Sequence, residues 1–142
     1  MRQITSAFGI AFLILAGLYF IRPGVWGTHL TGTHTLIHLV TGIIAVWVGT
    51  RSSMKVISIV TLVLGLCYLG LGVAGFAVGS WGLPSAGVPG PGNSKMWLVV
   101  PGIIELGLRD HVVHLVAGAA FIVAMALSLF SAGDTATPNP AE

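Results

Sequence analysis

Four long apolar stretches dominate this sequence and restrict what the chain can fold into. They cover about residues 4–21, 34–50, 56–79 and 111–131, and none of them contains Asp, Glu, Lys or Arg. A helix of about 20 residues crosses a hydrocarbon layer about 30 Å thick. The stretches therefore predict four transmembrane helices in an all-α, polytopic membrane four-helix bundle, which forms a single domain over residues 1–131.

The composition excludes the common soluble classes. Only 7% of the 142 residues are charged, against roughly a quarter in an average soluble domain, and the mean hydropathy is +0.97. So few charges cannot cover the surface of a soluble enzyme, and the chain is too apolar to be disordered. The net charge of +2 comes from scattered residues, which excludes a nucleic-acid footprint and leaves the lipid bilayer as the expected surroundings.

Polar and proline-rich segments separate the four stretches. Arg22-Pro23-Gly24 ends the first helix, which we interpret as uncleaved because no small-residue cleavage site follows it. Residues 51–55 predict a short turn between antiparallel helices. The first half of the 80–109 loop is expected to be irregular, and its second half to lie partly at the membrane interface. Residues 132–142 are expected to form a disordered tail.

An internal repeat relates the second stretch to the fourth. Residues 38–42 read H-L-V-T-G and residues 114–118 read H-L-V-A-G. The repeat predicts that the bundle is a duplicated two-helix hairpin, in which the second and fourth helices run parallel. His38 and His114 are then expected to lie at the same depth in the membrane.

The four-span topology places every histidine toward one side of the membrane. His34 and His38 are spaced i, i+4, and His111 and His114 are spaced i, i+3, so each pair shares a helix face. Gly42 and Gly118 lie one turn below the repeated histidines, where they would allow a helix or a flat cofactor to approach closely. The five histidines on that side are His29, His34, His38, His111 and His114.

Several roles remain open for these histidines. One interpretation is that they form hydrogen bonds between helices, because polar side chains often join helices within a membrane. Ionisable residues in a membrane segment also commonly have a functional task. His38 and His114 are therefore candidate ligands of a haem or chlorophyll-type tetrapyrrole, with Gly42 and Gly118 allowing its approach. The candidate ligands of a metal ion are His34, His38, His111, His114 and Asp110, although Asp110 also fits the N-cap of the fourth helix.

The openings of the second and fourth helices resemble a known family. H-x3-H-L-x-x-G at residues 34–42 and D-x3-H-L at residues 110–115 are similar to the signatures of small four-helix bacterial membrane proteins grouped as domain of unknown function number 4383. The resemblance covers about residues 4–131 and implies four spans in a bacterial inner membrane, with no known activity. Thr35 and His111 stand where that family has Asn.

These observations predict a non-enzymatic membrane protein that acts as a homo-oligomer or as an accessory subunit of a larger membrane complex. The alternatives are a tetrapyrrole-binding subunit that uses His38 and His114, and a small transporter or proton-relay element. No cofactor is identified by the sequence itself. The positive-inside rule favours cytoplasmic N- and C-termini, because Lys95 lies in the long loop and counts less than a charge next to a helix.

Overall fold

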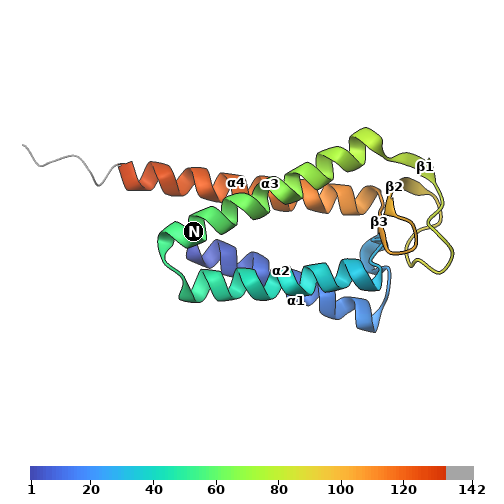
Figure 1. The fold of residues 1–142 in the computed structure, drawn as a ribbon, viewed down its shortest axis with the longest axis horizontal. Helices are drawn as coiled ribbons and strands as arrows, with labels where there is room; N and C mark the ends of the chain where they lie inside the picture. The colour runs from blue at the N-terminus through green and yellow to red at the C-terminus, as the bar shows by residue number, and fades with distance from the viewer. Residues whose placement is uncertain (134–142) are drawn as a thin grey trace, which may run out of the picture.

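Four long helices form a bundle that is closed at one end by a small sheet (Figure 1). The computed structural model describes the backbone of residues 1–133 and the side chains of residues 1–128. In chain order, the elements are α1 (Arg2–Ile21), the short 3-10 helix η1 (Val25–Gly27), α2 (Gly32–Arg51), α3 (Met54–Val78), β1 (Ser80–Gly82), β2 (Ser94–Val100), β3 (Ile104–Leu106) and α4 (Leu108–Gly133).

The predicted all-α four-helix bundle is confirmed. Each of the four helices is long and apolar enough to cross a membrane, and each predicted range falls within three residues of the observed bounds. α1 ends where Pro23 follows an extended Arg22, as the sequence indicated. At its C-terminal end, α4 continues through Gly133. Residues 132 and 133, which were predicted to begin a disordered tail, are therefore helical. The rest of the predicted tail, residues 134–142, lies outside the described residues.

The helices associate as two hairpins, because α1 contacts α2 and α3 contacts α4 far more extensively than either hairpin contacts the other. Glycines allow both close crossings. A Cβ on Gly42 would lie 2.9 Å from the carbonyl oxygen of Gly9, and a Cβ on Gly118 would lie 2.7 Å from Cα of Leu69. The hairpin arrangement agrees with the predicted architecture, while the duplication itself stays a prediction.

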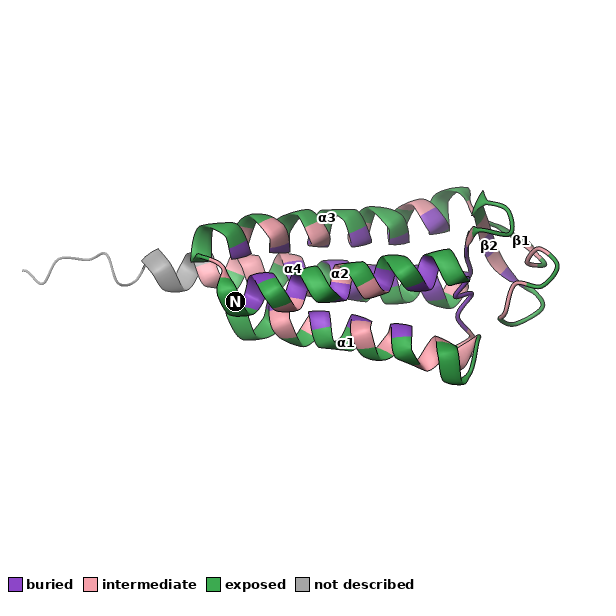
Figure 2. Ribbon diagram, turned by 60° about the horizontal axis from the view of Figure 1, so that its bottom comes forward, coloured by how far each residue is buried: buried purple, intermediate pink, exposed green. Residues whose placement is uncertain are grey.

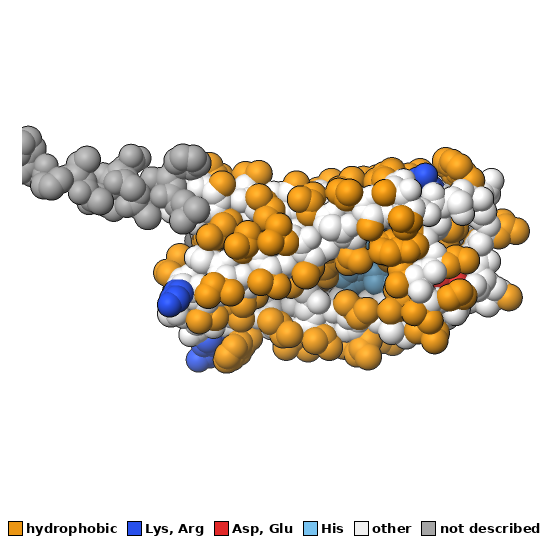
Figure 3. All heavy atoms as spheres, turned by 45° about the horizontal axis from the view of Figure 1, so that its top comes forward, with side chains coloured by type: hydrophobic (Ala, Val, Ile, Leu, Met, Phe, Trp, Pro, Cys, Tyr) orange, Lys and Arg blue, Asp and Glu red, His pale blue; other side chains and the backbone are white. Residues whose placement is uncertain are grey.

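The burial pattern is that of a bundle in lipid. Buried residues follow the inward faces of the helices, and exposed residues cover the outward faces (Figure 2). The exposed residues are largely apolar, including Ile14, Trp47 and Val116, which are 56%, 62% and 64% exposed. Figure 3 shows hydrophobic side chains along the length of the visible face, with histidine visible in a hollow between them.

A three-stranded antiparallel sheet lies within the 80–109 loop, where the sequence predicted no strand, while residues 83–93 between β1 and β2 are irregular as expected. β2 is the central strand, with Trp81 of β1 opposite Lys95 and Leu106 of β3 opposite Trp97. Ser94 and Met96 are buried while their neighbours are less so, which is the period-2 pattern of a strand with one covered face. A turn after Pro101 uses Gly102 at φ 76° and lets β3 return along β2.

Candidate functional site

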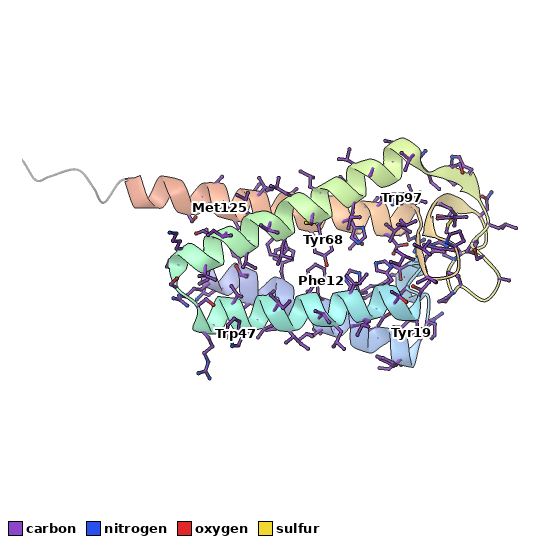
Figure 4. All side chains as sticks on the ribbon, in the orientation of Figure 1. Phe12, Tyr19, Trp47, Tyr68, Trp97 and Met125 are labelled. Atoms are coloured by element: carbon purple, nitrogen blue, oxygen red, sulfur yellow. The ribbon has the colours of Figure 1, made fainter. Side chains whose placement is uncertain are left out.

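A layer of rings crosses the bundle in the half that lies nearer the sheet. Phe12 of α1 stacks on His38 of α2, with ring centroids 5.2 Å apart, and on Tyr68 of α3, with centroids 4.8 Å apart. Figure 4 shows Phe12 and Tyr68 in the interior of the bundle between the two hairpins. The ring of Tyr68 lies 5.3 Å from that of His114 on α4. All four helices thus contribute to one buried layer.

Three histidines come together in this layer, and they are His34, His38 and His114. Each offers a ring nitrogen within 4.8 Å of the others, and their side chains are only 2–3% exposed. His38 and His114 each lie six residues after the first residue of their helices, which is about 9 Å along the helix axis. Their ring centroids are 6.0 Å apart, so the two hairpins meet at this site.

The ring nitrogens of these histidines differ in their partners. Nε2 of His34 and Nε2 of His38 lie 3.0 Å apart, while Nδ1 of His34 lies 3.4 Å from the carbonyl oxygen of His29. When Nδ1–H donates to that carbonyl, Nε2 keeps its lone pair. Nδ1 of His38 and Nδ1 of His114 are buried and have no hydrogen-bond partner among the described residues. Such atoms in a membrane interior are costly, and they mark a place where a ligand would be stabilised.

His29 connects the loop before α2 to the start of α4. Its backbone N–H donates to Oδ2 of Asp110 at 2.9 Å, its Nδ1 lies 3.4 Å from the same oxygen, and its Nε2 lies 3.1 Å from the Pro91 carbonyl oxygen. Burial lowers the pKa of His29, but the interactions with Asp110 and Pro91 outweigh burial, so the pKa lies above its ordinary value. The protonated ring therefore fits this pocket of the loop.

Asp110 lies inside the first turn of α4 and is not its N-cap, contrary to the sequence prediction. Its Oδ2 accepts a hydrogen bond from the Gly107 N–H at 2.8 Å, which is the reach-back contact of a capping box. Oγ of Ser94, on β2, accepts from the Leu108 N–H at 2.9 Å. The strand thus supplies a cap that local sequence could not show, and Asp110 is directed toward His29 instead of the three histidines.

His111 also lies apart from the three histidines. Its Nε2 is 2.9 Å from the Lys95 carbonyl oxygen, so it joins α4 to β2. Glu105 on β3 is fully buried and accepts from the backbone N–H groups of Ser85 and Gly102. Burial raises the pKa of Glu105, but these hydrogen bonds outweigh it and the pKa lies below its ordinary value. Both residues hold the sheet in place.

The candidate residues named from the sequence thus separate into groups. Of the five candidate metal ligands, His34, His38 and His114 converge, while His111 and Asp110 face the sheet and the loops. Gly42 and Gly118 lie at helix crossings within the two hairpins, where they allow close packing. The ring layer of Phe12 and Tyr68 could not be predicted from the sequence, because single aromatic residues in apolar helices carry no signal of which neighbour they will contact.

Comparisons with known proteins add nothing to this geometry, since no protein-family model, curated protein or solved structure matches the chain. The resemblance to the family of unknown function therefore stays a prediction.

Proposed function

We propose that this chain is a non-enzymatic integral membrane protein that binds one transition-metal ion through His34, His38 and His114. The convergence of three buried imidazoles from two hairpins is the observation that carries the proposal. Neutral imidazole is a preferred ligand of zinc, copper, nickel and iron. Three protein ligands leave a fourth position open, as in sites where a metal meets another molecule.

The distances between the histidine ring nitrogens are compatible with a single bound zinc ion. Zinc binds imidazole nitrogen at about 2.0–2.1 Å, so two nitrogens on one tetrahedral ion lie about 3.4 Å apart. The Nε2 atoms of His34 and His38 are 3.0 Å apart, and all three ligand atoms lie within 4.8 Å. Small rotations of the rings would bring them to one ion. The His29 carbonyl beside Nδ1 of His34 is the kind of outer partner that orients ligating histidines.

A tetrapyrrole held between His38 and His114 is less well supported. A porphyrin would need a wide, flat slot between the two rings. The ring of His34 lies 4.6 Å from that of His38 and 5.8 Å from that of His114, and Phe12 and Tyr68 stack in the same layer. A single ion fits this arrangement with less rearrangement than a macrocycle does.

The apolar outer faces of the helices support an accessory or oligomeric role. Trp47 and Val116 are more than half exposed, as are many other apolar side chains, and they can contact either lipid or another membrane subunit. We therefore retain the proposal that the protein acts as a homo-oligomer or within a larger membrane complex. No observation on the described residues favours the transporter or proton-relay alternative over metal binding.

A zinc titration of the protein, purified in detergent without a histidine tag and stripped with a chelator, tests the proposal. We expect one ion per chain and a gain in unfolding free energy that reaches about 2.7 kcal/mol at a free zinc concentration 100 times the Kd. Cobalt in place of zinc should give the visible absorption of a tetrahedral site.

Variants locate the site. His34→Gln, His38→Gln and His114→Gln should each weaken zinc binding at least about 100-fold. His111→Gln is the matched control, because His111 lies on the same helix as His114 but contacts the Lys95 carbonyl. Circular dichroism checks that each variant remains helical. Unchanged binding in the three variants, or an equal loss in the control, would overturn the proposal.

A further inference from the structure

An apolar groove of about 580 Å³ runs between α1 and α4 and ends at the histidine layer. This volume is in the range of about 300–1,000 Å³ that is typical of small-molecule sites. Ala11 on α1 and Val113 and Val116 on α4 line the groove and are exposed, so it opens sideways toward the lipid. A molecule dissolved in the membrane could enter it without passing through water.

Two histidine side chains make the inner end of the groove polar. His38 and His114 both line it, both are 2% exposed, and both have a buried Nδ1 with no hydrogen-bond partner among the described residues. Water cannot satisfy these atoms readily at a depth where the surroundings are hydrocarbon. An occupant with hydrogen-bonding oxygen atoms at one end would satisfy them and would leave its apolar part along the walls.

The charged side chains that line the groove already have partners, which favours a neutral head group, because a charge without a counter-ion is costly in apolar surroundings. Asp110 lines the groove, but its buried carboxylate accepts from the His29 N–H and lies 3.4 Å from Nδ1 of that ring. Arg109 also lines the groove, but its guanidinium donates to the Trp26 carbonyl. The inner wall is formed in part by Phe12, which stacks on His38, so a flat ring is better accommodated than a branched head group.

We infer that this groove binds a lipid-soluble quinone, with the carbonyl oxygens of its ring at His38 and His114 and its prenyl tail along α1 and α4. Binding at His114 does not depend on the metal site, because Nδ1 of His114 can carry the ring proton with or without an ion. When no ion is bound, Nε2–H of His38 donates to Nε2 of His34 and Nδ1 of His38 can only accept. When Nε2 of His38 binds the ion, its Nδ1–H is free to donate, since metal-bound histidines keep one N–H for an outer partner.

Decylubiquinone is the probe for the test, added to the full chain in nanodiscs of neutral phospholipid. Trp26 lines the groove and is exposed, so its fluorescence should be quenched as the quinone binds. We expect quenching that saturates at about one quinone per chain. Quenching that only rises linearly with the added quinone would indicate partition into the lipid and would overturn the inference.

Two kinds of variant test the location. Ala11→Phe fills the groove and should weaken quinone binding at least about tenfold. Ala77→Phe is the matched control, because Ala77 is exposed on α3, which does not line the groove, and it should bind as the unmodified chain does. His114→Leu removes one hydrogen bond and should weaken binding about tenfold. Equal affinities of Ala11→Phe and Ala77→Phe would overturn the inference even if the histidine variant fails to fold.

Further controls separate this inference from the metal proposal and from other occupants. Ala11→Phe should retain zinc binding, whereas His34→Gln should lose zinc but retain the quinone, because His34 does not line the groove. Oleic acid should not displace decylubiquinone. Displacement by oleic acid at similar concentrations would assign the groove to acyl chains and overturn the quinone inference, while leaving the metal site unaffected.

Discussion

The Oγ1 atoms of Thr5 and Thr61 lie 2.9 Å apart and form a hydrogen bond between α1 and α3. Both side chains are fully buried. The bond joins the two hairpins, which share few other contacts.

Replacing either threonine by valine should weaken the link between the hairpins. Hydrogen bonds between membrane helices contribute about 0.6 kcal/mol on average and up to about 1.7 kcal/mol. We expect a double-mutant cycle of Thr5→Val and Thr61→Val, measured by unfolding in mixed detergent, to give a coupling energy in this range. Thr50→Val should have little effect, because Thr50 is exposed and its hydroxyl bonds to its own helix. Additive effects of the two substitutions would show that the bond does not form.

The crossing of α3 and α4 depends on Gly118. A Cβ there would lie 2.7 Å from Cα of Leu69, and backbone atoms cannot move aside easily. We expect Gly118→Ala to lower the unfolding free energy by about 1–3 kcal/mol. Gly70→Ala is the control on α3, where a Cβ meets nothing within 4 Å, and it should be neutral or stabilising by up to about 1 kcal/mol. Similar losses in both variants would argue against this helix crossing.

The start of α4 depends on the carboxylate of Asp110. Its Oδ2 accepts from the backbone of both His29 and Gly107, so Asp110→Ala leaves two buried donors unsatisfied and should cost about 1–3 kcal/mol or more. Ser94→Ala removes the one bond to Leu108 and should cost about 0.5–2 kcal/mol. Thermal unfolding of the two variants should therefore rank Asp110→Ala as the less stable. The reverse order would contradict the capping arrangement.

His29 should make the stability depend on pH. Because its folded pKa lies above the ordinary value of 6.5, its contribution to stability is fully present below about pH 6.5 and is lost as the pH rises through the folded pKa. Asp110 and Glu105 are the charged groups that favour its protonation. We expect the Tm in detergent to fall as the pH rises above 6.5, and His29→Gln to reduce that fall. An identical pH profile in the variant would show that His29 does not titrate in this range.

Glu105 should make the stability depend on pH in the acidic range. Its folded pKa lies below the ordinary value of 4.5, so its contribution is present above about pH 4.5 and is lost as the pH falls through the folded pKa. A loss of stability below pH 4.5 that is smaller in Glu105→Gln would match this expectation. A variant that follows the unmodified chain at every pH would contradict it.

The sequence predicted the helices well because a membrane-spanning helix has a strong local signal, an uncharged apolar stretch of sufficient length. The repeat around His38 and His114 predicted that they lie at the same depth, and the i, i+4 spacing placed His34 on the same helix face as His38. The sequence could not show that His111 lies apart from these three histidines, because this depends on the position of the sheet. His111 lies about 4.5 Å nearer the start of α4 than His114 does, where its Nε2 contacts the Lys95 carbonyl oxygen of β2. The sheet that provides this contact had only a weak sequence signal, the short and interrupted apolar pattern around Met96.

The division of the site between two hairpins has a consequence for biogenesis. His34 and His38 belong to the first hairpin, whereas His114 belongs to α4, which leaves the ribosome after the other three described helices. A nascent chain that has inserted only α1 and α2 can offer two imidazoles, and the third arrives after the remaining spans have been translated. Loading of an ion would then be a late event in maturation, which follows the lateral association of the second hairpin with the first within the bilayer.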